Sequence, residues 1–375
     1  MPAILTRASY LARVAFCASV ISGTAACTSH SPRGDPAADS AAMRTKLETE
    51  TGSDRFAGAA LLARLDNDTP RVLFSGGYGL ADRENGVANT IDTRFRIGSM
   101  NKMFTAVAVL QLVQAGRIRL TDPVGRYIPG YPNGDVAGKV TIHQLLTHTG
   151  GTGDIFGPGY DAHGREMTTH DDWIGLYGER GPSFEPGTRY AYSNYGFVIL
   201  GVVIERVSGE SYYDYISENI YGPAGMTRSG MPPESIPDNL RAVGYSRLDG
   251  SARWTPTSSI VSGRGIAAGG GYSTVGDLLS FVAALMSNRL LNGEYTNLLI
   301  TGKVDTGRGF RYAYGFGDGR KNGSGAVGHS GGAPGTNGDP KIYAGTGYVL
   351  VALSNLDPPA ATDISAFMHE RVMKW

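Results

Sequence analysis

Residues 99–116 read Ser99-Met100-Asn101-Lys102-Met103-Phe104-Thr105-Ala106-Val107-Ala108-Val109-Leu110-Gln111-Leu112-Val113-Gln114-Ala115-Gly116. Apolar residues occur on nearly every side of this segment, which is typical of a buried helix that ends at a glycine. Residues three apart share a helix face, so Ser99 and Lys102 lie one turn apart where the dipole favours negative charge. Burial lowers a lysine pKa, and neutral Lys102 could then accept the serine proton. The pattern occurs once and predicts a nucleophile with its base; the alternative is a capping serine and a solvated lysine.

A second proton carrier is expected in a Tyr-x-Asn tripeptide, which occurs at Tyr131, Tyr192 and Tyr295. Tyr131 falls in a Gly/Pro-rich turn, and Tyr295 falls in a segment with the pattern of a surface helix. Tyr192 instead leads directly into an apolar helix that starts near Asn194, so it can project into a cleft where a lysine charge would favour its phenolate. We therefore predict Tyr192 as the proton carrier. The alternative is a packed tyrosine whose hydroxyl bonds to the backbone.

The sequence Gly328-His329-Ser330-Gly331-Gly332 supports two interpretations. Because it spells Gly-x-Ser-x-Gly, Ser330 could be the nucleophile of an α/β-hydrolase, at a turn between a strand and a helix. However, residues 333–338 are rich in Gly and Pro and cannot start a helix, and His369 is the only histidine beyond them. The preferred interpretation is a strand edge, with His329 lining the cleft and the Gly332 N–H pointing at the oxyanion.

Strands are expected from both ends of the chain and helices mostly from the middle. The strand-like segments are residues 56–64 and 71–78, which form a hairpin pattern, and 347–354. The expected helices are residues 100–115, 142–147, 194–207, 212–220, 275–287 after the capping candidate Ser273, and 360–373. This order predicts an α+β fold, with an antiparallel sheet built from both termini and flanked by helices. A helical lobe would be inserted at about residues 117–255, and the active site would lie in the cleft between.

The ordered set Ser99-x-x-Lys102, Tyr192-x-Asn194 and His329-Ser330-Gly331 resembles the three motifs of the serine β-lactamase and penicillin-binding-protein superfamily. The likeness is strongest to the class C-like branch, which includes CubicO-type hydrolases, family VIII esterases, D-stereospecific aminopeptidases and DD-carboxypeptidases. Residues 145–151, 184–187 and 331–335 resemble the same branch. The likeness runs from about Phe56 to the C-terminus.

The resemblance implies a β-lactamase/transpeptidase-like fold and a role for each site residue. Ser99 would be the acylated nucleophile, Lys102 and Tyr192 its bases, and Asn194 a partner of the substrate amide. The N–H groups of Ser99 and Gly332 would form the oxyanion hole. His329 stands where β-lactamases carry a lysine, which puts efficient recognition of a β-lactam carboxylate in doubt.

Composition excludes several other functions. Lys plus Arg and Asp plus Glu number 34 each, so no excess of positive charge favours a nucleic-acid partner. The glycines of residues 263–271 form no Gly-x-Gly-x-x-Gly run between a strand and a helix, and no cofactor is expected. The pairs His143/His148 and His163/His170 do not fit the His-Glu-x-x-His spacing, so we expect loop or surface histidines and no metal site.

The first residues have the layout of a secretory signal. Arg7 and Arg13 precede an apolar stretch, residues 14–26, that is too short to span a bilayer as a mature helix. We therefore expect a signal peptide at residues 1–26 and an exported protein, periplasmic or anchored at the membrane. A flexible tether would follow at residues 27–50, and the hydrolase domain would occupy residues 51–375.

Cys27 leaves two alternatives open. Thr24-Ala25-Ala26 resembles the small-residue box before the lipid-modified cysteine of bacterial lipoproteins, with Thr24 in place of the usual Leu. Lipidated Cys27 would anchor the protein to the membrane; otherwise a plain signal peptidase site lies nearby, and Cys27 is removed or inert. Cys17, the other cysteine, lies within the expected signal, so no intrachain disulfide is expected.

These observations predict an exported serine hydrolase that forms an acyl-enzyme with a small-molecule ester, amide or peptide. A β-lactamase or DD-peptidase is the alternative enzyme. The non-enzymatic alternative is a cell-wall-binding lipoprotein that keeps the fold without turnover. Loss of Ser99, Lys102 or Tyr192 would indicate the latter, and all three are present.

Overall fold

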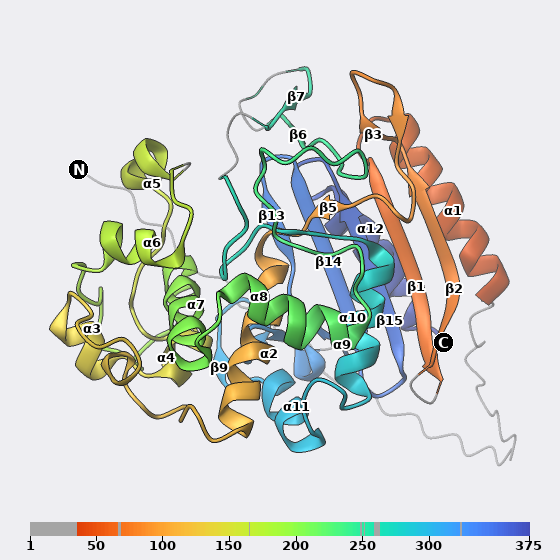
Figure 1. Cartoon of the computed structure of the whole chain (residues 1–375). Coiled ribbons are helices and arrows are strands. Elements are labelled where there is room, and N and C mark those ends of the chain that lie inside the picture. The colour runs from red at the N-terminus through yellow and green to blue at the C-terminus, as the bar shows by residue number, and fades with distance from the viewer. Residues whose placement is uncertain are drawn as a thin grey trace, which may run out of the picture. The chain divides into compact units, whose positions relative to one another are not determined.

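The computed structural model describes residues 36–66, 69–164, 166–247, 250, 252–258, 263–322 and 325–375. The predicted signal peptide, Cys27 and the first part of the predicted tether lie outside the described residues. A nine-stranded antiparallel sheet runs in the order β2-β1-β15-β14-β12-β11-β10-β9, with β13 paired to β14 (Figure 1). Its strands are β1 (Gly58–Asp66), β2 (Thr69–Tyr78), β9 (Val304–Asp305), β10 (Arg311–Tyr312), β11 (Gly317–Asp318), β12 (Val327–Gly328), β13 (Gly331–Ala333), β14 (Thr336–Tyr343) and β15 (Tyr348–Ser354).

The two ends of the domain meet in this sheet, as the sequence predicts. Strand β1 forms the expected hairpin with β2 and pairs on its other side with β15, Gly58 opposite Ser354 and Arg64 opposite Tyr348. Successive side chains of a strand point to opposite faces, so the apolar runs of β1 and β15 feed two cores. Ala60 and Leu62 belong to one core, and Ala59 and Leu61 belong to the other.

Helix α1 (Pro36–Gly52) corrects the prediction of a flexible tether at residues 27–50. Met43 and Leu47, one helical turn apart, are 0% and 1% exposed in the core that also contains α12 (Ala360–Val372). The segment contains four Ala residues, which favour helix, and its narrow apolar stripe packs against the sheet and α12. The local composition could not reveal that partner, because the strands beneath it come partly from the other end of the chain.

The remaining helices do not belong to the face of the sheet that α1 and α12 cover. Figure 1 shows α3 to α6 away from the large sheet, and α7 lies between them and α8. They are α2 (Asn101–Gln114), α3 (Gly134–Lys139), α4 (Ile142–Leu146), α5 (Pro158–His163), α6 (His170–Tyr177), α7 (Asn194–Ser208), α8 (Tyr212–Ile216), α9 (Gly222–Ala224), α10 (Val275–Met286) and α11 (Gly293–Ile300). Three two-stranded sheets join β3 (Leu80–Asp82) to β4 (Val87–Ala88), β5 (Phe95–Arg96) to β8 (Tyr272–Ser273) and β6 (Tyr245–Ser246) to β7 (Thr255–Pro256).

Two local details differ from the sequence-based predictions. The cap of α10 is Thr274, whose side chain accepts from the backbone N–H of Asp277, and not Ser273, which belongs to strand β8. The helix expected over residues 212–220 is α8 followed by a π-helical turn, Ser217–Tyr221. Helix α2 is buried along most of its length, as its all-round apolar pattern predicts.

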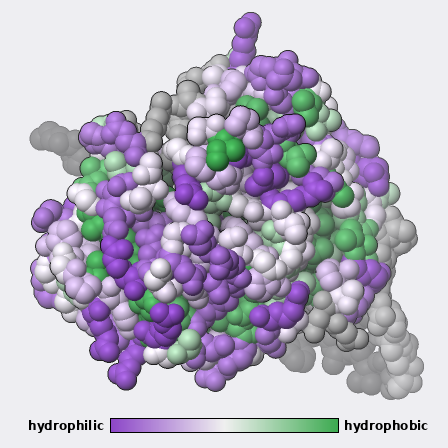
Figure 2. Space-filling model, in the orientation of Figure 1, coloured by the Kyte–Doolittle hydropathy of each residue, from purple (hydrophilic) through white to green (hydrophobic). Residues whose placement is uncertain are grey.

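The surface is predominantly polar on the face shown in Figure 2, where apolar residues form separate small patches. Among the described residues no helix is both long enough and apolar enough to cross a membrane.

Candidate active site

Ser99 lies in the 3-10 turn Gly98–Met100 that leads directly into α2. This turn requires glycines. Gly98 has a left-handed φ of 52°, and a Cβ on it would lie 3.2 Å from the backbone N of Gly332. A Cβ on Gly331 would lie only 2.0 Å from the carbonyl oxygen of Ile97. The absence of both side chains lets strand β13 lie directly against the turn that carries Ser99.

Lys102 is 0% exposed, and its ammonium or amine group has three polar neighbours. Its Nζ lies 3.2 Å from Ser99 Oγ and 2.7 Å from Asn194 Oδ1. It also donates to the backbone carbonyl of Ala268. The Nζ is 4.7 Å from the centre of the Tyr192 ring. The structure therefore brings together Ser99, Lys102, Tyr192 and Asn194.

Burial decides the charge of Lys102. Loss of solvation lowers the pKa of Lys102 to about 7, although the carboxylate of Asp154 acts in the opposite direction. A neutral amine has two N–H donors and one lone pair. The Asn194 and Ala268 oxygens can only accept, so they take the two N–H groups, and the lone pair faces the Ser99 hydroxyl. This arrangement suits removal of the serine proton.

Tyr192 lies immediately before helix α7, which is capped by the Ser193 side chain accepting from the Gly196 N–H at 2.9 Å. Burial raises the pKa of the Tyr192 phenol well above its ordinary value, and a hydrogen bond with Ser99 offsets only part of that effect. The expectation that a lysine charge favours the phenolate is therefore wrong for the resting site. The phenol stays protonated because burial penalises its anion and the pKa of Lys102 is itself lowered.

Asn194 has both ends of its side chain engaged within the protein. Its Oδ1 accepts from Lys102, and its Nδ2 lies 2.9 and 3.2 Å from the two carboxylate oxygens of Asp154. These contacts fix which end of the amide faces the lysine. Asp154, which the sequence analysis missed, thus reaches Lys102 through Asn194. The predicted role of Asn194 as a partner of the substrate amide would require one of these contacts to be shared.

His329 lies beside the cleft as predicted and is held by two hydrogen bonds. Its Nδ1 lies 2.7 Å from the backbone oxygen of Ser330, which can only accept, so Nδ1 carries the proton. Its Nε2 can then accept from the Tyr312 hydroxyl at 2.9 Å. Burial and the charge of Lys102 lower the pKa of His329 to about 3, so the ring is neutral at physiological pH. It is not a fixed cation.

Ser330 lacks the surroundings of the rival nucleophile. It joins β12 to β13, so it lies between two strands and not at a turn from a strand into a helix. His369, the only histidine that could complete a later triad, lies with its Nδ1 2.6 Å from the Tyr343 hydroxyl. Gly332 follows in β13, next to the turn that contains Ser99.

His148 contacts the residues on both sides of Tyr192. Its backbone oxygen accepts from the Ala191 N–H at 2.9 Å, and its Nδ1 accepts from the Ser193 N–H at 3.1 Å. The ring lies 4.3 Å from the Tyr192 ring. His148 lies in the turn after α4, as the prediction of a loop histidine has it, although it is only 1% exposed; His170 lies in α6 and is 0% exposed, so the expectation of a loop or surface histidine is wrong for His170. Their metal spacing was uninformative, but His148 belongs to the 145–151 stretch that carried the family resemblance.

A cavity of about 490 Å³ opens on this group. Its walls include Ser99, Tyr190, Tyr192, Arg308, Tyr312 and His329. This volume is in the range of small-molecule binding sites. Among the described residues no cluster of three or more His, Cys, Asp or Glu side chains is arranged to hold a metal ion.

A serine one helical turn before a buried lysine, at the edge of an antiparallel sheet, defines the class of Ser-x-x-Lys serine hydrolases. The chain belongs to the beta-lactamase family, whose sequence model matches residues 43–372. The predicted superfamily, the α+β fold class and the serine hydrolase class are thereby confirmed.

Three similar proteins illustrate the relationship. The putative penicillin-binding protein PbpX of Bacillus subtilis is 34% identical over 263 residues, which cover 69% of this chain and 63% of that protein, so the chain spans less than two thirds of its length. A penicillin-binding protein from Bacillus halodurans has a TM-score of 0.76 at 31% identity, covering 86% of this chain and 98% of the other. A D-stereospecific amidohydrolase from Streptomyces has a TM-score of 0.69 at 28% identity, covering 87% and 97%.

Proposed function

We propose that the protein is an exported hydrolase that cleaves small esters, amides or peptides through an acyl-enzyme on Ser99. The single observation that carries the proposal is the hydrogen-bond pattern of Lys102. Two of its three partners, Asn194 and Ala268, present acceptor oxygens, and the third is the Ser99 hydroxyl. Such a site holds the amine with its lone pair toward the nucleophile.

In the first step, Ser99 Oγ forms a bond to the substrate carbonyl carbon while its proton passes to the Lys102 amine. The carbonyl oxygen becomes an oxyanion, which the N–H groups of Ser99 and Gly332 would stabilise. The bond to the leaving group then breaks, and the leaving oxygen or nitrogen takes the proton of the Tyr192 phenol. The proton held by Lys102 returns to Tyr192, so both residues regain their starting states.

In the second step, water replaces the leaving group. Lys102 takes a proton from the water as its oxygen attacks the acyl carbon, and Ser99 recovers a proton as it departs. The products are a carboxylic acid and the free enzyme. Loss of one such general acid or base lowers the rate by about 10² to 10⁴.

His329 supports esters or amides in preference to β-lactams. A β-lactamase needs a fixed cation for the carboxylate of the drug, and a neutral imidazole offers only an N–H that is already bonded to Ser330. The D-stereospecific amidohydrolase among the similar structures supports D-amino-acid amides as test substrates. The similar penicillin-binding proteins support slow acylation of Ser99 by penicillins, which would then act as inhibitors.

The nucleophile is tested with Ser99→Ala and Ser330→Ala, assayed on p-nitrophenyl acetate and butyrate and labelled with a fluorophosphonate. We expect Ser99→Ala alone to abolish turnover and labelling. Tyr192→Phe should lower the rate by about 10² to 10⁴, and Tyr131→Phe should not. Tyr131, whose hydroxyl lies 2.9 Å from that of Tyr195, is a matched buried control. Labelling that survives Ser99→Ala and disappears in Ser330→Ala would overturn the assignment.

The substrate preference is tested by comparing kcat/KM for these esters and for small D-amino-acid amides with kcat/KM for nitrocefin and benzylpenicillin, from pH 6 to 8.5. We expect the esters or amides to be the better substrates at every pH. Larger values for the β-lactams would make the protein a β-lactamase. Binding of cell-wall fragments without any turnover would favour the non-enzymatic alternative.

Export and lipidation rest on residues 1–27 alone. Arg7 and Arg13 before an apolar stretch support removal of about the first 26 residues. Mass spectrometry of the mature protein from its natural host decides the question. A diacylglyceryl adduct on Cys27 supports membrane anchoring, an unmodified N-terminus beyond Cys27 excludes it, and an intact Met1 would overturn export.

A further inference from the structure

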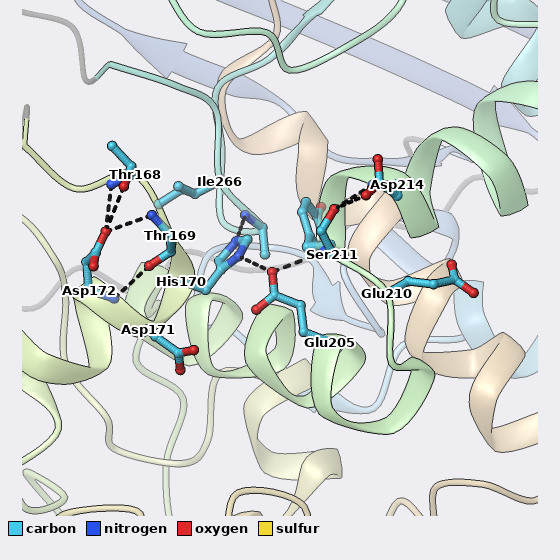
Figure 3. A network of polar contacts seen from close by, with 12 residues as sticks. Thr168, Thr169, His170, Asp171, Asp172, Glu205, Glu210, Ser211, Asp214 and Ile266 are labelled. Atoms are coloured by element: carbon cyan, nitrogen blue, oxygen red, sulfur yellow. Dashed lines mark hydrogen bonds and ion pairs between the residues drawn. The ribbon is translucent and has the colours of Figure 1, made fainter.

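A second polar network reaches Lys102 through the backbone carbonyl of Ala268. It centres on His170, the first residue of α6 and completely buried (Figure 3). The His170 Nε2 lies 3.0 Å from the backbone N of Ala267 and must accept its hydrogen. The other ring nitrogen, Nδ1, therefore carries the proton and donates it to Glu205 Oε1 at 3.1 Å. Glu205 also accepts from the Tyr212 N–H at 3.1 Å.

Ala267 lies inside a tight turn, residues 266–269, closed by two hydrogen bonds between the backbones of Ile266 and Gly269 at 2.8 and 3.0 Å. The carbonyl groups of this turn face helix α2. The Ile266 oxygen accepts from Asn101 Nδ2 at 2.7 Å, and the Ala267 oxygen accepts from Thr105 Oγ1 at 2.7 Å.

The third carbonyl, that of Ala268, accepts from Lys102 Nζ. Three carbonyl groups of the turn thus accept hydrogen bonds from polar side chains of α2. On its other side, the N–H of Ala267 donates to His170, and in the described contacts no other N–H of the turn bonds to a side chain. Gly269 at its end packs against the backbone of Gly98, next to the nucleophile.

We propose that His170 is a positioning residue for Lys102: by accepting the Ala267 N–H, it holds the Ala268 carbonyl against the lysine and keeps water away from the amine. Glu205 contributes by fixing the tautomer of His170 that can accept. The inference rests on the proposed role of Lys102 as the base, and it adds a buried dyad outside the catalytic cavity to that role.

The packing around the turn points to the same function. A Cβ on Gly201 of α7 would lie 2.8 Å from Ala267 Cβ and 2.8 Å from His170 Cδ2. The helix therefore lacks a side chain where the histidine and the turn come together. The other polar or titratable groups that face Lys102 are Ser99, His148, Asp154, Tyr192 and His329, and in the described hydrogen bonds none of their side chains bonds to the 266–269 turn.

The test is the pH dependence of kcat/KM for p-nitrophenyl butyrate in His170→Leu and His170→Gln. Without the acceptor, the turn loosens and water reaches Lys102, which favours the ammonium form. We expect the acid limb of the His170→Leu profile to move up by about one pH unit, so that the rate falls about tenfold near pH 6 and recovers above pH 9. Gln can accept the Ala267 N–H and should restore most of the original profile.

His143→Leu is the matched control, because this half-buried histidine bonds to the Tyr314 hydroxyl and does not contact the turn. Its profile should keep the midpoint of the parent protein. If His170→Leu does not fold, Gly201→Ala displaces the turn from the other side in a segment where alanine favours helix. It should move the midpoint in the same direction.

An unchanged midpoint with a rate reduced equally at every pH would overturn the proposal, because a purely structural defect lowers the amount of active protein and not the basicity of Lys102. A His170→Gln profile no better than that of His170→Leu would also overturn it. The rate at which a fluorophosphonate labels Ser99 across the same pH range reports the protonation state of Lys102 and does not require turnover. If the proposed function were wrong, the parent protein itself would show no ester hydrolysis and no labelling. That result is distinct from a failure of the proposed role of His170, which would appear only in the variants.

Discussion

Burial of Lys102 changes its protonation state and so allows it to act as a base. A lysine in water is protonated at neutral pH and cannot accept a proton, whereas loss of solvation brings the pKa of Lys102 to about 7. The amine is the reactive form, so kcat/KM should rise with pH through this value and level off above it. Activity lost on acidification should return on neutralisation.

We expect the charge of Asp154 to influence the pH at which kcat/KM rises, that is, the midpoint of the acid limb of the pH profile. Its carboxylate favours the ammonium form of Lys102 and so raises the lysine pKa, against the larger effect of burial. Asp154→Asn removes the charge and keeps an acceptor for Asn194. The pKa of Lys102 should fall, and the acid limb of kcat/KM should move to lower pH, with a larger fraction of the maximal rate retained at pH 6.

The comparison for this variant is Asp171→Asn, which removes a carboxylate that pairs with Arg206 at 2.8 Å, away from the cavity. Its profile should coincide with that of the parent protein. A limb that stays in place or moves upward in Asp154→Asn would contradict the assigned electrostatic role of Asp154.

Among single residues, the sequence singled out those that we propose for the reaction and missed several that surround them. Ser99, Lys102, Tyr192, Asn194, His329 and Gly332 come from three short motifs whose spacing reflects chemistry, and the structure brings them together. Asp154, His148 and His170 contact the site through hydrogen bonds to segments that are distant in the sequence. Such contacts produce no short sequence motif with a recognisable spacing.

Helix α1 shows how an element depends on a distant partner. Met43→Ala and Leu47→Ala should each lower the free energy of unfolding by about 2 to 5 kcal/mol, since each empties a buried site against the sheet. Urea denaturation measures this loss. Glu48→Ala, on the exposed side of the same helix, should stay within about 0.5 kcal/mol of the parent protein.

The ester hydrolysis rate per folded molecule should not change in these variants, because α1 belongs to the core on the face of the sheet opposite α2. A fall in kcat with unchanged stability would show that α1 acts on the site and is not only a cover for the sheet.

Elements with strong internal patterns were predictable, and elements that depend on contacts were not. The apolar runs of α2, α7 and β15 mark buried segments wherever they pack. Helix α1 carries only two large apolar residues, Met43 and Leu47, so its local sequence resembles a solvated linker. Its structure follows from the sheet face that it covers, and that face exists only in the folded domain.

For the whole molecule, the order of elements along the chain predicted the architecture, because strands at both ends and helices between them leave few compact arrangements. The sequence could not give the order of the short strands β9 to β12, each of two residues. Strands so short have almost no periodicity of their own, and their pairing depends on the turns that join them.

The pairing of β1 with β15 also determines when the domain can fold. Gly58 lies opposite Ser354, so the centre of the sheet joins the first strand of the domain to its last strand. A nascent chain that has reached residue 340 still leaves one edge of β1 unpaired, because residues 348–354 have not yet been synthesised. Contacts so distant in sequence form late and slowly. The domain therefore cannot complete its core until β15 has emerged from the ribosome, and chaperones can bind the unfolded chain throughout that interval.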